Sequence, residues 1–221
     1  MKIDIFTLFP QWFAWMSEAR HLTNASEHGE FLVEAIDMRV TTPLTCGQVD
    51  DAPYGGGPGM VIRVDVVAAA FEARYGVAAE RVRDTRRVVV LTPRGRPFTD
   101  ALARELAEIP ALTLLCGRYE GFDERVHTEL ANDEISLGSF VLAGGEIPAM
   151  AIVDATARRL PGALGNVESL DAESFSPSLG GRTEYPHFTR PQEFRGWEVP
   201  AILRSGNHGA VAKWREEQLG S

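Results

Sequence analysis

Short apolar runs alternate with longer segments of helical spacing along the chain up to about Gly165. Buried strands are predicted at Lys2–Leu8, Val88–Leu91 and Ala111–Cys116, which are short and rich in leucine or β-branched residues. A helix is predicted at Val64–Tyr75, where good helix formers recur at helical spacing. Strands that alternate with helices in this way indicate an α/β domain with a mainly parallel sheet.

Weaker signals complete the same alternation. Further strands are expected at Phe31–Val40 and Phe140–Ala143. Further helices are expected at Pro10–Glu18, Thr99–Ala107, Phe122–Leu130 and Glu146–Arg159.

The composition changes after the alternating region. Ser, Gly, Pro and acidic residues dominate from Asn166 to Pro186, which is typical of a mobile linker. The predicted organisation is therefore a main domain over residues 1–165, a flexible linker over 166–188 and a small unit over 189–221 that contains Trp197 and Trp214.

The net charge of the 221-residue chain is −9, which disfavours a uniformly basic nucleic-acid binder. Six arginines fall between Arg81 and Arg96, so a local basic surface is possible there. No run of about 18 apolar residues is present, and the first residues are too few and too acidic for a secretory leader. Cys46 and Cys116 lack metal-ligand spacing, and two reduced thiols in a cytoplasmic protein are expected.

Asp50–Met60 is a glycine-rich loop with the sequence DDAPYGGGPGM. Its three consecutive glycines permit positive φ angles and close approach of another chain to the backbone. No GK[ST] follows, and no G-x-G-x-x-G fingerprint is present, so P-loop and dinucleotide-binding enzymes are disfavoured. A tight surface turn is the alternative reading of this loop.

Three further glycine-bearing segments lie at or beside the carboxyl ends of strands: Leu91–Gly95, Leu115–Gly121 and Ser136–Gly145. Ligands bind at this edge of open α/β sheets. Each segment alone could be a plain turn, but together they predict a pocket of main-chain amides and carbonyls. Such a pocket suits an adenine and a methionine tail. His127, on a predicted helix, is expected to be structural or exposed.

Six motifs occur in the order found in the bacterial tRNA (guanine-N1)-methyltransferase family, which the chain resembles over nearly its whole length. They are DDAPYGGGPGM, LTPRG, LCGRYEGFDERV, EISLGSFVLAGGEIPAM, DATARRLPGALG and YPHFTRP…VPAILRSGNH. The resemblance implies a SPOUT-type fold with a deep C-terminal trefoil knot, followed by a small helical C-terminal domain. Relatives continue beyond Trp214 through further helices, so this domain is expected to be shortened.

The resemblance implies S-adenosylmethionine as methyl donor and a homodimer whose active sites lie at the subunit interface. The implied cofactor-binding residues are Leu91, Thr92, Pro93, Gly95, Gly117, Tyr119, Glu120, Ser136, Leu137, Gly138, Phe140, Leu142, Gly144, Gly145 and Pro148. The implied contacts to the tRNA anticodon stem-loop are Tyr54, Gly56, Arg190, Ser205, Asn207 and His208.

The family's catalytic pair falls on Arg158 and Glu173. A carboxylate near N1 of guanine can take its proton during methyl transfer, and an arginine can stabilise the charge that builds on O6. The implied reaction is methylation of N1 of the guanosine 3′ of the anticodon, at position 37 of the tRNA. Without the resemblance, Arg158 would be read as a helix cap and Glu173 as a solvated acid. Magnesium dependence is also implied, through carboxylates and substrate, with no metal ligands assigned.

Several positions depart from the family pattern. The base is Glu173 where aspartate is usual, Arg94 replaces a glutamine, and Ser139–Phe140 replaces an acidic residue followed by tyrosine. These departures leave an alternative open: a divergent SPOUT paralogue that binds S-adenosylmethionine and RNA but modifies another guanine, or is inactive. A non-catalytic binding module is the third reading.

Overall fold

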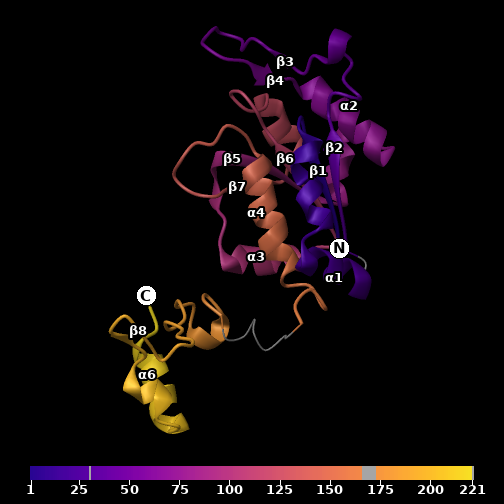
Figure 1. Cartoon of the computed structure of the whole chain (residues 1–221). Coiled ribbons are helices and arrows are strands. Elements are labelled where there is room, and N and C mark those ends of the chain that lie inside the picture. Colours follow the sequence, from indigo (N-terminus) through magenta and orange to yellow (C-terminus); the bar gives the residue numbers. More distant parts are fainter. Residues whose placement is uncertain (30, 166–172, 221) are drawn as a thin grey trace. The chain divides into compact units, whose positions relative to one another are not determined.

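Five parallel strands form the central sheet of the protein, in the order β2-β1-β6-β5-β7. The structure, a computed structural model, describes residues 1–29, 31–165 and 173–220. The chain divides into two units, Met1–Gly165 and Asn166–Ser221. The strands of the first unit are β1 (Lys2–Thr7), β2 (Leu32–Asp37), β5 (Arg87–Pro97), β6 (Ala111–Cys116) and β7 (Asp133–Ser136) (Figure 1). All of their pairings are parallel, which confirms the predicted α/β class.

Helices connect these strands and cover the sheet. The α-helices of the first unit are α1 (Arg20–His28), α2 (Val64–Tyr75), α3 (Asp100–Ala107) and α4 (Glu146–Ala157). Shorter turns of helix are η1 (Pro10–Ser17), η2 (Thr45–Gly47), η3 (Ala79–Asp84) and the π-helical η4 (Val126–Leu130). Two short antiparallel strands, β3 (Asp50–Asp51) and β4 (Val61–Ile62), flank the glycine-rich loop.

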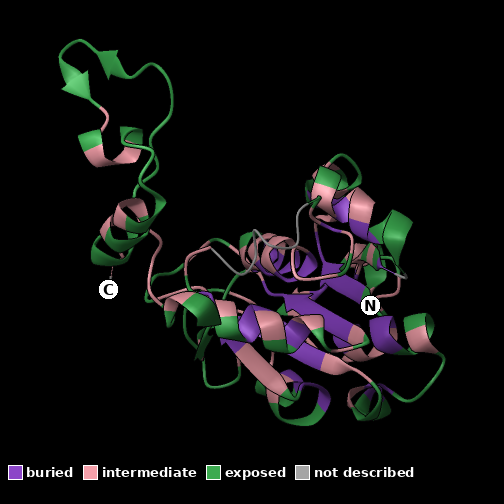
Figure 2. Cartoon of the chain, turned by 90° about the horizontal axis from the view of Figure 1, so that it is seen from below, coloured by how far each residue is buried: buried purple, intermediate pink, exposed green. Residues whose placement is uncertain are grey.

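The sheet has an apolar core on each of its faces. Val89 and Leu91 pack into the core that includes α1, α3 and α4, whereas Val88 and Val90 pack into the core formed with α2, η3 and η4. This alternation follows from the two-residue period of a strand. Figure 2 shows the resulting belt of buried residues through the strands. A strand buried on both faces explains why Val88–Leu91 is apolar throughout.

Strand β5 extends beyond the predicted Val88–Leu91, because it resumes after a loop that interrupts it. Leu91 and Arg96 both pair with Ile135 of β7, so the four residues between them leave the ladder as a loop. Loops of this kind re-aim side chains next to functional sites. The sequence LTPRG is therefore an excursion from within a strand, and the strand resumes after it.

One strand prediction is wrong, and one helix was not predicted. Phe140–Ala143 is an irregular loop, and the strand lies earlier, at Asp133–Ser136. The charged residue Asp133 made this segment look unlike a buried strand in the sequence. In the structure, its charge is compensated by ion pairs with Arg87 and Arg96. Helix α1, which was not predicted, buries only Leu22 and Ala25, so its apolar signal is weak.

The second unit is described from Glu173 onward, and residues 166–172 of the predicted linker lie outside the described residues. It contains η5 (Pro177–Leu179), a hairpin of β8 (Glu193–Phe194) and β9 (Trp197–Glu198), η6 (Ala201–Arg204) and α6 (His208–Glu217). Across the described part of both units, no helix is both long and apolar enough to cross a membrane.

Candidate functional site

A cavity of about 380 Å³ opens at the carboxyl ends of β6, β5 and β7, which are neighbours in the sheet. This volume lies within the range of small-molecule sites. Its walls come from the loop after Leu91, the loop after Cys116 and the segment between β7 and α4. The three glycine-bearing segments singled out in the sequence therefore meet around one hollow.

Every predicted cofactor residue except Gly95 lines this cavity. Gly95 has a different role, because a Cβ at this position would lie 2.5 Å from the backbone of Glu134 and Ile135. Because Gly95 has no side chain, the end of the loop can pack directly against the backbone of β7. Residues that line the cavity but were not predicted to do so include Arg94, Arg118, Phe122, Glu124, His127 and Ile135.

The second and third loops are joined by main-chain contacts. Gly145 N donates to Gly117 O at 2.9 Å, and Arg118 and Gly144 form an isolated antiparallel bridge. A Cβ on Gly145 would lie 2.6 Å from Cys116 Cα, so only glycine permits this approach. Backbone groups rather than side chains thus shape this end of the cavity.

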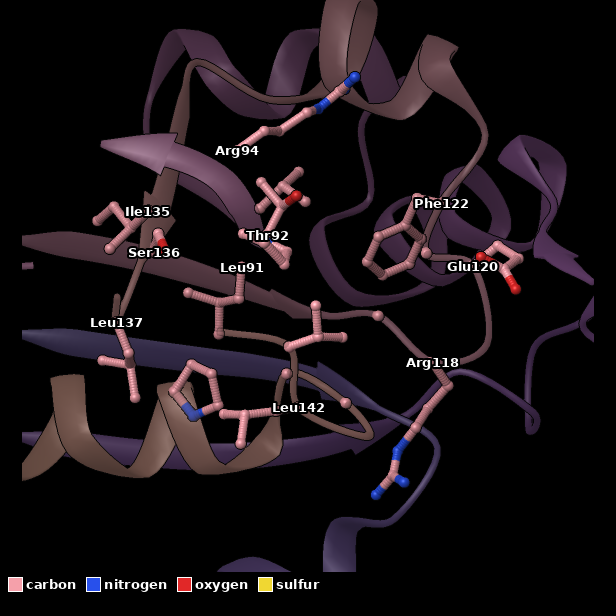
Figure 3. Close-up of a pocket in the computed structure, with 18 of the residues that line it drawn as sticks. Leu91, Thr92, Arg94, Arg118, Glu120, Phe122, Ile135, Ser136, Leu137 and Leu142 are labelled. Carbon is pink, nitrogen blue, oxygen red and sulfur yellow. The ribbon is translucent and has the colours of Figure 1, made fainter. Parts of the chain in front are cut away.

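The interior of the cavity is apolar with a few polar groups. Figure 3 shows Leu91, Leu137 and Leu142 around the hollow, with Thr92 and Ser136 nearby. Ser136 is occupied within its own turn, since its Oγ donates to Gly138 O at 3.0 Å. Apolar walls with sparse polar groups suit a flat heterocycle and a thioether or sulfonium chain better than a polyanion.

Ionised side chains form a network at the rim of the cavity. Arg94 pairs with Glu124 at 2.7 Å and with Glu134 at 3.5 Å, and the hydrogen bond with Glu124 raises the pKa of Arg94. His127 Nδ1 lies 2.8 Å from Glu134 Oε1, and its side chain is largely buried. The expectation of a structural His127 agrees with this contact, although the residue also lines the cavity.

A second charged group lies just behind the cavity and was missed in the sequence. Glu146, the first residue of α4, is fully buried and its Oε2 lies 3.0 Å from Arg118 Nε. The sequence contained a sign of this pair. Glu146 is the first residue of the apolar segment EIPAMAIV, and a carboxylate that is buried with such a segment requires a partner.

Arg158, one of the two predicted catalytic residues, is not among the residues that line this cavity. Arg158 is the C-cap of α4, whereas Gly145 and Pro148, at the start of that helix, line the cavity. At about 1.5 Å per residue, the length of α4 separates these two ends by roughly 18 Å. Glu173 belongs to the second unit.

The predicted RNA-contacting residues lie in both units. Tyr54 is fully exposed at the tip of the β3–β4 hairpin, and Gly56 beside it has a φ of 78°. Arg190 is exposed. Ser205, Asn207 and His208 lie together at the start of α6, where Asn207 Oδ1 accepts from Ala210 N at 3.1 Å as the helix cap.

The possible basic surface between Arg81 and Arg96 does not form. All of these arginines except Arg83 make ion pairs with carboxylates: Arg81 with Asp84, Arg86 with Asp4, Arg87 with Asp133, Arg94 with Glu124, and Arg96 with Asp133. Arg83 donates to the backbone oxygen of Thr128. The sequence shows the arginines but not their partners, which come from distant strands and helices.

The chain is similar over its whole length to known proteins. It matches, over residues 1–220, the sequence profile of a family described as tRNA (Guanine-1)-methyltransferase TrmD. A tRNA (guanine-N(1)-)-methyltransferase of Pelotomaculum thermopropionicum is 49% identical over 218 residues, covering 99% of this chain and 84% of the relative. Relatives of the same description are 45% identical in Sorangium cellulosum, covering 99% of this chain and 88% of the relative, and 47% identical in Gloeobacter violaceus, covering 99% and 92%.

Proposed function

The chain belongs to the tRNA (guanine-1)-methyltransferase family, and from this premise we propose how its own residues methylate N1 of a guanine in tRNA. The observation that carries the proposal is the cavity in which three glycine-bearing loops meet at the carboxyl edge of the sheet. The guanine is that at position 37, the nucleotide 3′ of the anticodon. Bases of a loop are already unpaired, so such a target costs less to expose than a base in a helix.

S-adenosylmethionine fits the cavity described above. Leu91, Leu137 and Leu142 offer apolar surfaces to the adenine and to the methionine chain. Main-chain groups of the three glycine-bearing loops that line the cavity can offer hydrogen bonds without a second charge. When bound, S-adenosylmethionine supplies an electrophilic methyl group from a sulfonium sulfur that leaves as a neutral thioether.

We infer a trefoil knot in the main domain, as in SPOUT methyltransferases. Its support is the path of the chain after β7, the strand at one edge of the sheet. From there the segment Leu137–Gly145 crosses beyond β5 and bonds to the loop after β6, with Gly145 N donating to Gly117 O. Crossings of this kind also occur in unknotted parallel sheets, so the resemblance to the family carries the inference of a knot.

We propose a homodimer with composite active sites, which the positions along α4 support. The helix starts at the cavity and ends at Arg158, roughly 18 Å away. Within one protomer, Arg158 is therefore too far from the cavity to touch a guanine there, and we propose that it serves the partner's cavity. Apolar side chains exposed around the cavity are suited to the interface: Tyr119, Phe140, Val141 and Ile147.

The proposed chemistry needs one base and one cation. Glu173 takes the N1 proton of guanine, so that the N1 lone pair can form the bond to the methyl carbon. Negative charge then develops on O6, and Arg158 stabilises it because a guanidinium remains protonated at any working pH. Glu173 carries one more methylene than the aspartate usual in the family, and the second unit positions it.

Recognition of the tRNA uses exposed groups from both units. We propose that Tyr54 and Gly56 contact the anticodon loop, and that Arg190, Ser205, Asn207 and His208 contact the stem-loop backbone. Asn207 keeps its Nδ2 for RNA, because Oδ1 is used in capping α6. We expect the protein to work in the cytoplasm, where its substrate is found.

The magnesium dependence implied by the family has no dedicated protein site in the described ranges. Over residues 1–29, 31–165 and 173–220, no group of three or more His, Cys, Asp or Glu side chains could hold a metal ion.

The test is methyl transfer from labelled S-adenosylmethionine to transcripts of an anticodon stem-loop and of whole tRNA. A transcript with guanine at position 37 should be methylated at N1, and one with adenine there should not. Transfer to a different guanine would identify a divergent paralogue. Binding of S-adenosylmethionine without transfer to any transcript would reduce the protein to an inactive relative.

A further inference from the structure

We propose that Arg118 is a positioning residue for methyl transfer, which fixes the shape of the donor cavity through a buried contact with Glu146. This inference rests on the proposed function and adds a residue to which that function assigns no role. Arg118 lines the cavity, but its guanidinium points away from the hollow formed by Leu91 and Leu142 (Figure 3). It therefore acts through its neighbours in the protein rather than by touching the donor.

The guanidinium joins two cavity loops. Arg118 itself lies in the loop after β6, and its Nη1 donates to Ala143 O at 3.4 Å in the segment before α4. Its Nε lies 3.0 Å from Glu146 Oε2, on the first residue of α4. Gly144 passes so close to both side chains that a Cβ on it would collide with Arg118 Nε and Glu146 Oε2. The loops are thus packed around this ion pair.

The ion pair is anchored to the sheet and shielded from water. Thr7, the last residue of β1, donates its hydroxyl to Glu146 Oε1 at 2.8 Å. The guanidinium carbon of Arg118 lies 4.4 Å from the ring centroid of Phe9 and 4.8 Å from that of Trp12. The side chains of Arg118 and Glu146 are only 14% and 1% exposed. A cation held between aromatic faces and a buried carboxylate has little freedom to move.

Such a clamp affects donor binding because Gly117, Gly144 and Gly145 are cavity residues on the two loops that it holds. Loosening this contact would move backbone groups that face the donor. A misplacement of about 1 Å can lower the rate of a reaction by up to about a hundredfold. The expected signature is weaker binding of S-adenosylmethionine with little change in the KM for tRNA.

The test compares Arg118→Lys with Arg86→Lys, which is a closely matched control. Arg86 forms a comparably buried ion pair at 2.8 Å with Asp4, which also pairs with Arg74; it is 12% exposed and lies 4.9 Å from the centroid of Tyr75. It does not line the cavity. Lysine keeps the charge at both positions but loses the flat, multiply donating guanidinium. Both variants should lose similar thermal stability, so that a difference in donor binding reflects the place of Arg118 beside the cavity rather than the loss of a buried ion pair.

We expect the Kd of S-adenosylmethionine, measured by calorimetry, to rise at least about tenfold in Arg118→Lys and to stay within about twofold of wild type in Arg86→Lys. Equal Kd values in the two variants would overturn the proposal. If Arg118→Lys fails to fold, Glu146→Gln replaces it, because the amide keeps an acceptor for Thr7 while removing the charge. A wild-type protein that does not bind S-adenosylmethionine would instead overturn the proposed function itself.

Discussion

The backbones of Gly95 and Ile135 lie so close together that a Cβ on Gly95 would sit 2.5 Å from Ile135 N. This approach closes the loop that interrupts β5, since Leu91 before the loop and Arg96 after it both pair with Ile135. The cavity wall formed by Thr92, Pro93 and Arg94 therefore depends on a residue that does not line the cavity.

Gly95→Ala should destabilise the protein and weaken donor binding together. The methyl group must displace backbone atoms of β7, and overpacking of this kind costs about 2 kcal/mol. Chemical denaturation and calorimetry with S-adenosylmethionine measure the two effects. Gly165→Ala is the control, because a Cβ there meets no atom within 4 Å. A Gly95→Ala protein as stable as that control would contradict the interpretation.

Asp133 should make stability depend on pH in the acid range. Burial raises the pKa of Asp133, but hydrogen bonds from Arg96 and Arg87 outweigh this effect and hold the pKa below its ordinary value. A carboxylate with a lowered pKa in the folded state stabilises the fold above its unfolded pKa, and this contribution is lost as the pH falls through the folded pKa.

Asp133→Asn should accordingly cost about 2 kcal/mol at pH 7, since charged hydrogen bonds are replaced by neutral ones. The difference from wild type should shrink as the pH falls below about 4. Urea denaturation of both proteins across this pH range measures it. A difference that stays constant with pH would show that the variant acts through packing rather than through charge.

Arg158 should act on the cavity of the partner subunit, and mixed dimers can show this. Arg158→Ala and the cavity-blocking variant Leu142→Arg should each be inactive alone. In a composite site, a mixed dimer pairs an open cavity with an intact arginine from the other protomer. Random equal mixing should then restore about a quarter of wild-type activity, because about half of the dimers carry one intact site of two. Mixtures that stay inactive would show that each protomer uses its own arginine, or that no dimer forms.

Tyr54→Ala should weaken tRNA use without affecting stability. The ring is fully exposed at the tip of the hairpin, so its removal leaves no cavity. Loss of one base-stacking contact should raise the KM for tRNA by about tenfold or more. Steady-state methylation kinetics measure this, with Val40→Ala as an exposed control in the same unit. An unchanged KM for tRNA would remove Tyr54 from the recognition surface.

Elements with a strong repeat pattern were predictable from the sequence, and those whose pattern depends on distant partners were not. Helix α2 and strand β6 have the predicted bounds, because their apolar residues follow a single local period. Strand β7 was not predicted, because it begins with the charged residues Asp133 and Glu134. Their charges are in fact compensated by Arg87, Arg96 and Arg94 from β5, and a linear reading does not show those contacts.

The sequence by itself determined the α/β alternation, the glycine loops and the family. The alternation follows from the local period of apolar residues, the loops from the backbone freedom of glycine, and the family from the order of the motifs. Only the tertiary structure decided which groups meet. It brought three loops to one cavity, assigned Gly95 to a backbone contact, buried Glu146 against Arg118 and placed Arg158 at the far end of α4. Those outcomes depend on distances between residues far apart in the chain, which are fixed only when strands pair and helices pack against them.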